Sequence, residues 1–283
     1  MGEASIPVNV FNPGQVFASI GFLEAADVLC GGATGKFDQV GTPSFKLKTN
    51  DDGNPFRAVL NFVAEADVTD IRPTNLMHIT SSQNDNVFPS AKIDKMALPV
   101  RLQHKNHVIE LSHWCDGSSR EAFKLYAGNR SALQIVQALL GTGTGYKGVR
   151  ALWEENADKM VRDPFDILTP MGGKFNFDPR GGWTAIDVGY SPNDVKHGVC
   201  ASPVVEILAA IGLEHARPLI DNKQRQAIEK QRVTYAIWDQ YLSPILARPV
   251  FGGASLGIPS QRFYFYRSMS GKNKITRFAK EEV

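Results

Sequence analysis

Residues 11–29 read FNPGQVFASIGFLEAADVL, and the rest of the chain has to pack around this stretch. Asn12 can cap a helix with its side chain, and Pro13 suits the first helical position, where its missing N–H costs nothing. Apolar residues then recur at helical spacing beside small residues that allow close packing. The pattern predicts a core helix over residues 13–29, and the alternation in residues 6–11 predicts a half-buried strand before it.

The turn into this helix has two interpretations. Free N–H groups at a helix N-terminus can hold a phosphate, and Asn12 and Gln15 are polar side chains close to them. An ordinary capped core helix explains the same residues without a ligand. The sequence leaves both open.

Further elements follow from periodicity and turn signals. Strands are predicted at residues 44–49, 98–102, 108–114, 123–127, 232–238 and 262–267. Helices are predicted at residues 132–140, 149–161 and 203–213, residues 56–66 fit either type, and the polar stretch 73–91 is expected to be a long loop. Because strands and helices do not alternate regularly, we expect an α+β fold of short, mainly antiparallel sheets packed with several helices. Two α+β halves are predicted, residues 1–140 and 149–283, which can also form one compact domain.

Composition places the chain among globular proteins, with 43% hydrophobic and 21% charged residues over 283 positions. The first residues lack the basic and apolar regions of a signal peptide, and no apolar stretch is long enough to span a membrane. We therefore expect a cytoplasmic protein. The three cysteines are far apart and the six histidines show no ligand spacing, so neither a disulfide framework nor a metal site nor another cofactor is expected.

Charge is distributed unevenly along the chain. Residues 217–283 carry twelve Lys and Arg against five Asp and Glu, a net charge of +7, whereas residues 1–216 carry a net charge of −5. Such an imbalance indicates a polyanion or an acidic partner surface, although a solvated basic tail has the same composition.

A glycine-rich run at residues 141–147, GTGTGYK, is compatible with a phosphate loop in composition only. Its glycines follow a helix rather than a strand, and Lys147 precedes Gly148 instead of Ser or Thr. A mobile loop with Lys147 and Arg150 near its end fits better, and such a loop is able to track a nucleic-acid backbone. No nucleophile with an adjacent base and no paired carboxylates stand out, so catalysis is not expected.

Three segments together carry a family resemblance: IPVNVFNPGQVFASIGFLEAADVL at 6–29, KLYAGNRSALQIVQALL at 124–140, and FDPRGGWTAIDVGYSPND followed by ASPVVEILAAIGLEHARP within 177–218. Their overall pattern resembles the short large-subunit family of type I-G (formerly I-U) CRISPR systems. The resemblance implies a non-catalytic subunit of a Cascade-type ribonucleoprotein that surveys DNA in antiviral defence.

In such complexes the large subunit binds duplex target DNA at the protospacer-adjacent motif, aids R-loop formation and recruits the helicase-nuclease. The implied partners are target DNA, the subunits that bind the guide backbone and guide ends, the helicase-nuclease and, indirectly, guide RNA. Phosphate contacts need Lys and Arg, and base edges are read by polar side chains. The candidates for these contacts are Asn12, Gln15, Asn129, Arg130, Lys147, Arg150, Lys174, Arg180, Asn193, Lys196, Arg262, Arg267, Lys272 and Lys274.

Taken singly, each candidate is explained more simply as a solvated charge or polar group, and the resemblance does not say which residues read DNA. Two other functions stay open. The chain can be a docking or extension module of the CRISPR helicase-nuclease, or a metal-dependent hydrolase whose catalytic residues are dispersed along the sequence.

Overall fold

Helix α1 (Pro13–Leu29) lies at the centre of the protein, with fourteen of its seventeen residues buried. The Asn12 side chain caps it, accepting a hydrogen bond from the Gln15 backbone N–H at 3.2 Å, and Pro13 occupies the first turn. The predicted core helix is confirmed. The computed structural model describes residues 1–71, 98–114, 123–126, 130–142, 145–183, 187, 189, 199–221 and 231–282.

Helix α6 (Pro203–His215) packs directly on α1, and two glycines set the distance between them. A Cβ on Gly21 would stand 1.9 Å from the backbone oxygen of Leu208, and one on Gly212 would stand 2.3 Å from that of Phe17. Both glycines end an Ala-x-Ile-Gly sequence. The short sequence similarity between the two helices therefore corresponds to a close helix crossing, where only glycine lets the backbones meet.

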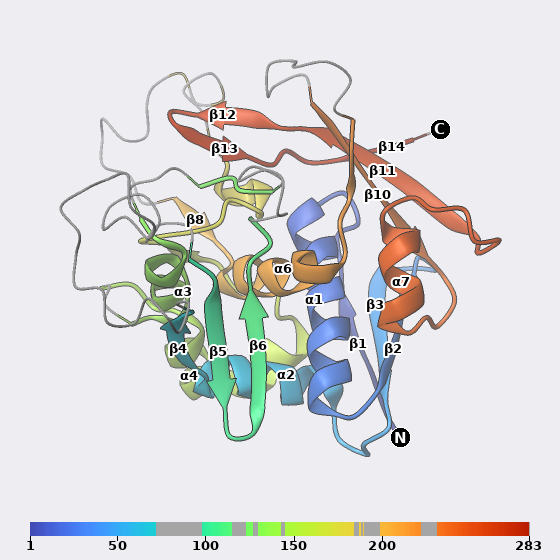
Figure 1. Ribbon diagram of the computed structural model, residues 1–283, viewed down its shortest axis with the longest axis horizontal. Coiled ribbons are helices and arrows are strands. Elements are labelled where there is room, and N and C mark those ends of the chain that lie inside the picture. Colours follow the sequence, from blue (N-terminus) through green and yellow to red (C-terminus); the bar gives the residue numbers. More distant parts are fainter. Residues whose placement is uncertain are drawn as a thin grey trace.

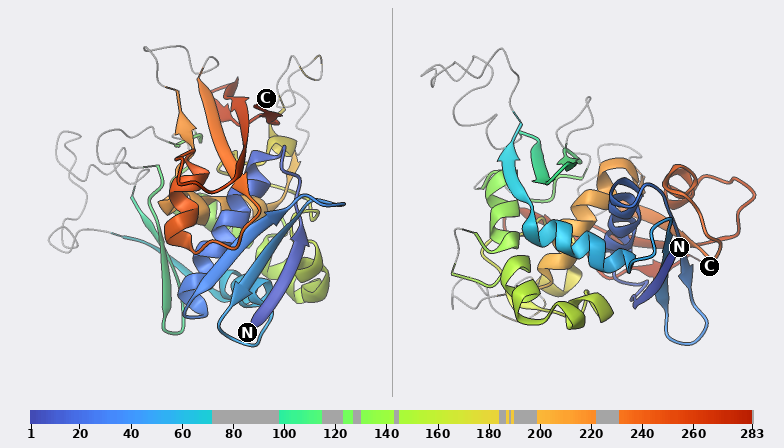
Figure 2. Two further views of the ribbon diagram at one scale, coloured as in Figure 1. Left: turned by 90° about the vertical axis from the view of Figure 1, so that its right-hand side faces the viewer. Right: turned by 90° about the horizontal axis from the view of Figure 1, so that it is seen from below.

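The remaining described elements form an α+β fold around this pair, as predicted. The other α-helices are α2 (Pro55–Glu65), α3 (Ala132–Leu140), α4 (Val149–Arg162) and α7 (Pro244–Phe251). Figure 1 shows α1 and α6 in the middle, the N-terminal sheet and α7 on one side and the β5–β6 hairpin on the other. The right-hand view of Figure 2, from below, shows α2 and α4 side by side at the lower end of the molecule.

The strand pairs of the described sheets are antiparallel. The N-terminal sheet has the order β1-β3-β2, from β1 (Gly2–Pro7), β3 (Ser44–Thr49) and β2 (Ala33–Asp38). A second has the order β4-β5-β6, from β4 (Asp67–Asp70), β5 (Val100–His104) and β6 (His107–Leu111). The C-terminal sheet has the order β14-β11-β10-β9, from β14 (Lys280–Glu281), β11 (Ser260–Tyr266), β10 (Arg232–Trp238) and β9 (Leu219–Ile220). Two-stranded pairs join β12 (Ser268–Ser270) to β13 (Asn273–Ile275) and β7 (Thr169–Pro170) to β8 (Cys200–Ala201).

One hydrophobic core draws on both predicted halves of the chain. The ring of Phe17 on α1 meets Phe123, Tyr235 and Phe251 edge-on, at centroid distances between 5.6 and 5.7 Å. These rings come from both sides of residues 141–148. In the part of the chain described, no helix is long and apolar enough to cross a membrane.

Some sequence predictions were wrong in detail. The first strand covers Gly2–Pro7 rather than residues 6–11, because beyond Pro7 the backbone leaves β3 to enter the α1 turn. The β5–β6 hairpin has a two-residue turn in which Lys105 has a φ of 53°, whereas the strands predicted at 98–102 and 108–114 leave a five-residue loop between them. Residues 123–126 form no strand, and β2 and α7 were not predicted. The ambiguous stretch is helix α2, capped by Asn54, and the loop predicted at 73–91 lies outside the described residues.

Candidate nucleic-acid interface

The strand β11 separates its aromatic side chains by type. Phe263 and Phe265 are buried, whereas Tyr264 is half-buried and Tyr266 has 48% of its surface exposed. Successive side chains of a strand point to opposite faces, so the phenylalanines enter the core and the tyrosines lie on the outer face of the sheet. The strand thus has one apolar face and one face on which aromatic rings meet solvent.

The buried face holds this strand rigidly. The Tyr235 ring on β10 stacks on Phe263 with centroids 5.7 Å apart and an interplanar angle of 14°. Its hydroxyl donates to the backbone oxygen of Val10 at 2.7 Å, and burial raises the pKa of Tyr235 well above its usual value, so the donor stays protonated. The sheet is a firm support for whatever its outer face binds.

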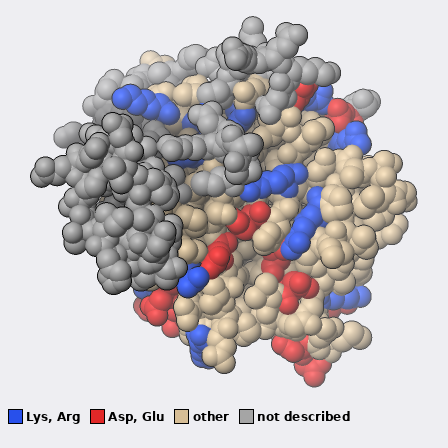
Figure 3. All heavy atoms as spheres, in the orientation of Figure 1, with Lys and Arg blue, Asp and Glu red and all other residues tan. Residues whose placement is uncertain are grey.

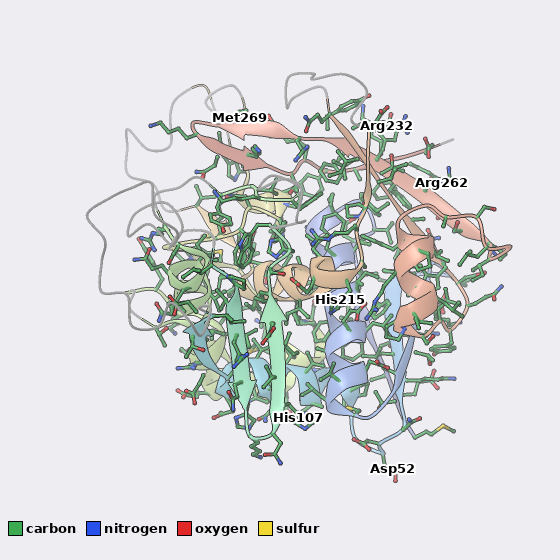
Figure 4. All side chains as sticks on the ribbon, in the orientation of Figure 1. Asp52, His107, His215, Arg232, Arg262 and Met269 are labelled. Carbon is green, nitrogen blue, oxygen red and sulfur yellow. The ribbon has the colours of Figure 1, made fainter. Side chains whose placement is uncertain are left out.

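Register places cations beside the tyrosines. Arg232 pairs with Tyr266, and Lys280 pairs with Tyr264, and directly paired residues share one face of a sheet. Arg262 lies two residues before Tyr264, on the same face. We call this set the tyrosine face: Arg232, Arg262, Tyr264, Tyr266 and Lys280. Figure 4 labels Arg232 and Arg262, which lie towards opposite ends of the sheet.

The tyrosine face is partly ordered by its own contacts. The Tyr264 and Tyr266 rings meet edge-on at 6.0 Å, and the Arg232 guanidinium lies 4.0 Å from the Tyr264 ring centroid. Arg232 also forms an ion pair with Glu282, and Arg262 donates to the Gly253 backbone oxygen at 2.9 Å. Lys280 is exposed. Flat rings flanked by positive charge can stack on bases and neutralise phosphates.

Four of the predicted contact residues lie elsewhere, in a polar cluster at the start of α1 and α6: Asn12, Gln15, Lys174 and Arg180. The buried Asp178 carboxylate accepts from Asn12 Nδ2 at 3.3 Å, and from Arg180 Nε and Nη2 at 2.9 and 2.8 Å. Gln15 Oε1 accepts from the Asn9 backbone N–H at 2.7 Å. These side chains connect parts of the chain to one another, and the ordinary capped helix is the arrangement seen here.

A second acid, Glu206, lies in the same cluster and is fully buried. Its Oε1 accepts from the Asp178 backbone N–H at 2.9 Å. Burial raises the pKa of Glu206 to about 7, although that hydrogen bond and the nearby Lys174 act against the increase. Burial also lowers the pKa of Lys174, whose ammonium donates to the Gly181 backbone oxygen. The hydrogen bonds of this cluster therefore hold the start of α1 and the start of α6 together.

Two predicted arginines also have internal roles. Arg150 donates to the backbone oxygens of Ala64 and Ala66 at 3.1 and 2.5 Å, where helix α2 ends. Arg267 has only 5% of its surface exposed and bonds to the Gln231 side chain. Arg267 is therefore buried, and the half-buried Arg150 uses its guanidinium for bonds within the fold.

The other predicted residues are exposed or half-buried, and two of them, Lys272 and Lys274, lie on the same β12–β13 hairpin. Arg130, Lys147, Arg262 and Lys272 are exposed, and Lys274 on β13 is half-buried. Lys147 forms an ion pair with Glu155. Of this group, only Arg262 lies on the tyrosine face. The predicted contacts Asn129, Asn193 and Lys196 lie outside the described residues.

Sequence reasoning missed four residues of the tyrosine face: Arg232, Tyr264, Tyr266 and Lys280. The sequence RFYFYR could have identified them, because alternate residues of a strand lie on the same face. Arg262, Tyr264 and Tyr266 then share one face, and Phe263, Phe265 and Arg267 share the other. Reading that parity would have removed Arg267 and added the tyrosines.

No family model, curated protein or solved structure matches this chain. Among the residues that the structure describes, no group of three or more His, Cys, Asp or Glu side chains is placed to hold a metal ion.

Proposed function

We propose that this protein is a non-catalytic, DNA-binding subunit of an RNA-guided CRISPR surveillance complex, and that its tyrosine face holds target DNA. The observation that carries the proposal is the pair of outward tyrosines, Tyr264 and Tyr266, flanked by Arg232, Arg262 and Lys280 on a rigid sheet. The net charge of +7 over residues 217–283 supports a polyanionic ligand.

Tyrosine rings distinguish the form of DNA that this face would hold. A base inside a duplex has no free face for a side chain to stack on, whereas an unpaired base does. Each stacked base contributes roughly 1–3 kcal/mol, with little dependence on its identity. The face thus suits a strand opened beside the protospacer-adjacent motif during R-loop formation, while base pairing to the guide reads the long sequence.

Reading of the duplex motif and recruitment of the helicase-nuclease belong to the same proposal and need other surfaces. Arg130, Lys147, Lys272 and Lys274 are the predicted contacts in the described residues that lie at or near the surface outside the tyrosine face. Phosphate contacts from such residues make binding salt-dependent without sequence preference.

The test is binding of the assembled complex, with guide RNA and neighbouring gene products, to labelled duplexes with varied flanking triplets across a salt series. The Tyr264→Ala/Tyr266→Ala variant should bind about fivefold more weakly or worse, as the loss of one stacked base predicts. Tyr264→Phe/Tyr266→Phe keeps the rings and should bind almost normally. Tyr146→Ala removes a tyrosine that is 46% exposed outside this sheet and is the matched control.

Equal binding by the alanine variant and the wild type, at every salt concentration and with every flank, would overturn the role of the tyrosine face. If the complex also binds normally without this subunit, the DNA-binding function fails, and a docking role becomes the better explanation.

A further inference from the structure

A second surface, independent of the tyrosine face, lies where the edge of the β4-β5-β6 sheet meets helices α1, α6 and α7. A groove of about 280 Å³ opens there, and apolar side chains including Ala25, Val28, Ile109 and Ile211 line it. Val28 is apolar, but 51% of its surface is exposed. We call this surface the edge groove.

Strand β6 borders the edge groove with a free edge. In the described residues it pairs only with β5, and the register joins His104 to His107 across the two-residue turn. In such a hairpin the pairs 104–107, 102–109 and 100–111 exchange hydrogen bonds, so the N–H and C=O groups of Val108 and Glu110 point away from β5. The Ser112 N–H has the same parity and donates outward to Glu214 on α6 at 2.5 Å.

The opposite side of the hairpin supports this assignment. The Ile71 N–H donates to the Pro99 backbone oxygen at 2.8 Å. Along β5, the backbone N–H and C=O groups of odd-numbered residues therefore point to β4, and those of even-numbered residues point to β6. Natural sheets usually protect a free edge with lysine, proline or a bulge. The sequence HVIEL of β6 contains no lysine or proline and a single charged residue, Glu110, and none of the other described strands pairs with its outer edge.

Charge selects the kind of strand. The groove is lined by Glu24, Asp27, Glu110 and Glu214 and by one Lys or Arg side chain, Arg248, which bonds to Glu24 at 2.6 and 2.8 Å. Glu110 also accepts from Arg101 on β5, at 2.6 and 3.1 Å. Counting Asp, Glu, Lys and Arg side chains, the lining has a formal net charge of −3, or −2 when the paired Arg101 is included. Figure 3 shows acidic side chains in the middle of this face with Lys or Arg side chains next to them, and Figure 4 labels His215 beside the groove and His107 at the hairpin tip.

We propose that the edge groove binds an extended segment of a partner protein in which apolar and basic residues alternate, added as a strand to β6. Main-chain hydrogen bonds to Val108 and Glu110 hold the segment, its apolar side chains enter the groove, and its basic side chains meet the acidic lining. A second copy of this chain is a poor occupant, because two acidic grooves would face each other.

The probe is a blocked octapeptide of alternating Val and Lys, titrated into the isotopically labelled full chain while backbone amide resonances are followed by NMR. The amides of Val108 and Glu110 should shift, and those on the tyrosine face should not. Replacing every Lys of the peptide by Glu, or methylating its Val nitrogens, should abolish the shifts. In the protein, Glu110→Lys reverses a half-exposed charge, removes its ion pair with Arg101 and should weaken binding about threefold to tenfold.

Equal shifts with the acidic or the N-methylated peptide, or none with the basic peptide at millimolar concentration, would overturn the proposal. Concentration-dependent dimerisation that protects the same two amides would identify a second copy as the occupant and overturn it too. DNA binding is measured separately, so failure here leaves the tyrosine face untouched.

Discussion

Replacing Glu206 by Gln should change how the stability of this protein depends on pH. Glu206 is buried in the first turn of α6, and burial raises the pKa of its carboxyl from 4.5 to about 7. The folded protein therefore keeps a proton that the unfolded chain has released. This contribution is fully present below pH 4.5 and is lost as the pH rises through about 7.

The size of the effect follows from the two pKa values. At about 1.4 kcal/mol per tenfold change in proton affinity, the change from 4.5 to about 7 corresponds to roughly 3 kcal/mol. Glutamine is neutral at every pH and its oxygen can still accept from the Asp178 N–H. Relative to wild type, Glu206→Gln should gain stability between pH 5 and pH 8 by an amount of this order.

Urea unfolding of both proteins at several pH values measures this difference directly, because the other titrating groups cancel. Glu154→Gln, which changes an exposed glutamate on α4, controls for the loss of one carboxylate. A difference between Glu206→Gln and wild type that stays constant from pH 5 to pH 8 would show that the buried carboxyl does not hold its proton as described.

Three further predictions concern packing and internal hydrogen bonds. Gly212→Ala should lower the unfolding free energy by about 2 kcal/mol, because its Cβ would meet the Phe17 backbone oxygen at 2.3 Å. Gly53→Ala, with nothing within 4 Å, should stay within about 0.5 kcal/mol, and equal urea midpoints for the two variants would refute the close crossing. Arg150→Met should cost about 2 kcal/mol through its bonds to Ala64 and Ala66, whereas Lys147→Met, at an exposed ion pair, should cost almost nothing in thermal unfolding. Tyr235→Phe should cost about 1–2 kcal/mol by leaving the Val10 oxygen unsatisfied, and a stability equal to that of the exposed-site variant Tyr266→Phe would contradict the bond.

Local signals predicted much of this fold. Caps and periodicity placed α1, α3, α4 and α6 within a few residues, since Asn12, Ser131 and Ser202 each cap the helix that follows. Strand β2 was not predicted, because its sequence ATGKFD begins directly after two glycines, which indicate a break in regular structure. Helix α7 was not predicted, because Pro249 lies inside it and an internal proline usually ends a helix.

The candidate contacts were harder to predict, because residue type alone does not show whether a basic or polar side chain bonds within the fold or faces solvent. Arg180 follows Asp178 by two residues, but only the fold shows that both lie at the meeting point of two helix ends. Arg150 likewise finds its partners 84 and 86 residues earlier in the chain. Strand parity was the exception, as it distinguishes Tyr264 and Tyr266 from Phe263 and Phe265 without a structure.

The tyrosine face is tested most directly by photo-crosslinking within the assembled, guide-loaded complex. Target duplexes would carry 5-iodouracil at successive positions of each strand beside the flanking motif, and crosslinked peptides would be identified by mass spectrometry. Crosslinks to Tyr264 or Tyr266, at positions that become unpaired and only when guide and target match, are the predicted result. Crosslinks to this subunit that consistently avoid the C-terminal sheet would contradict the proposed interface.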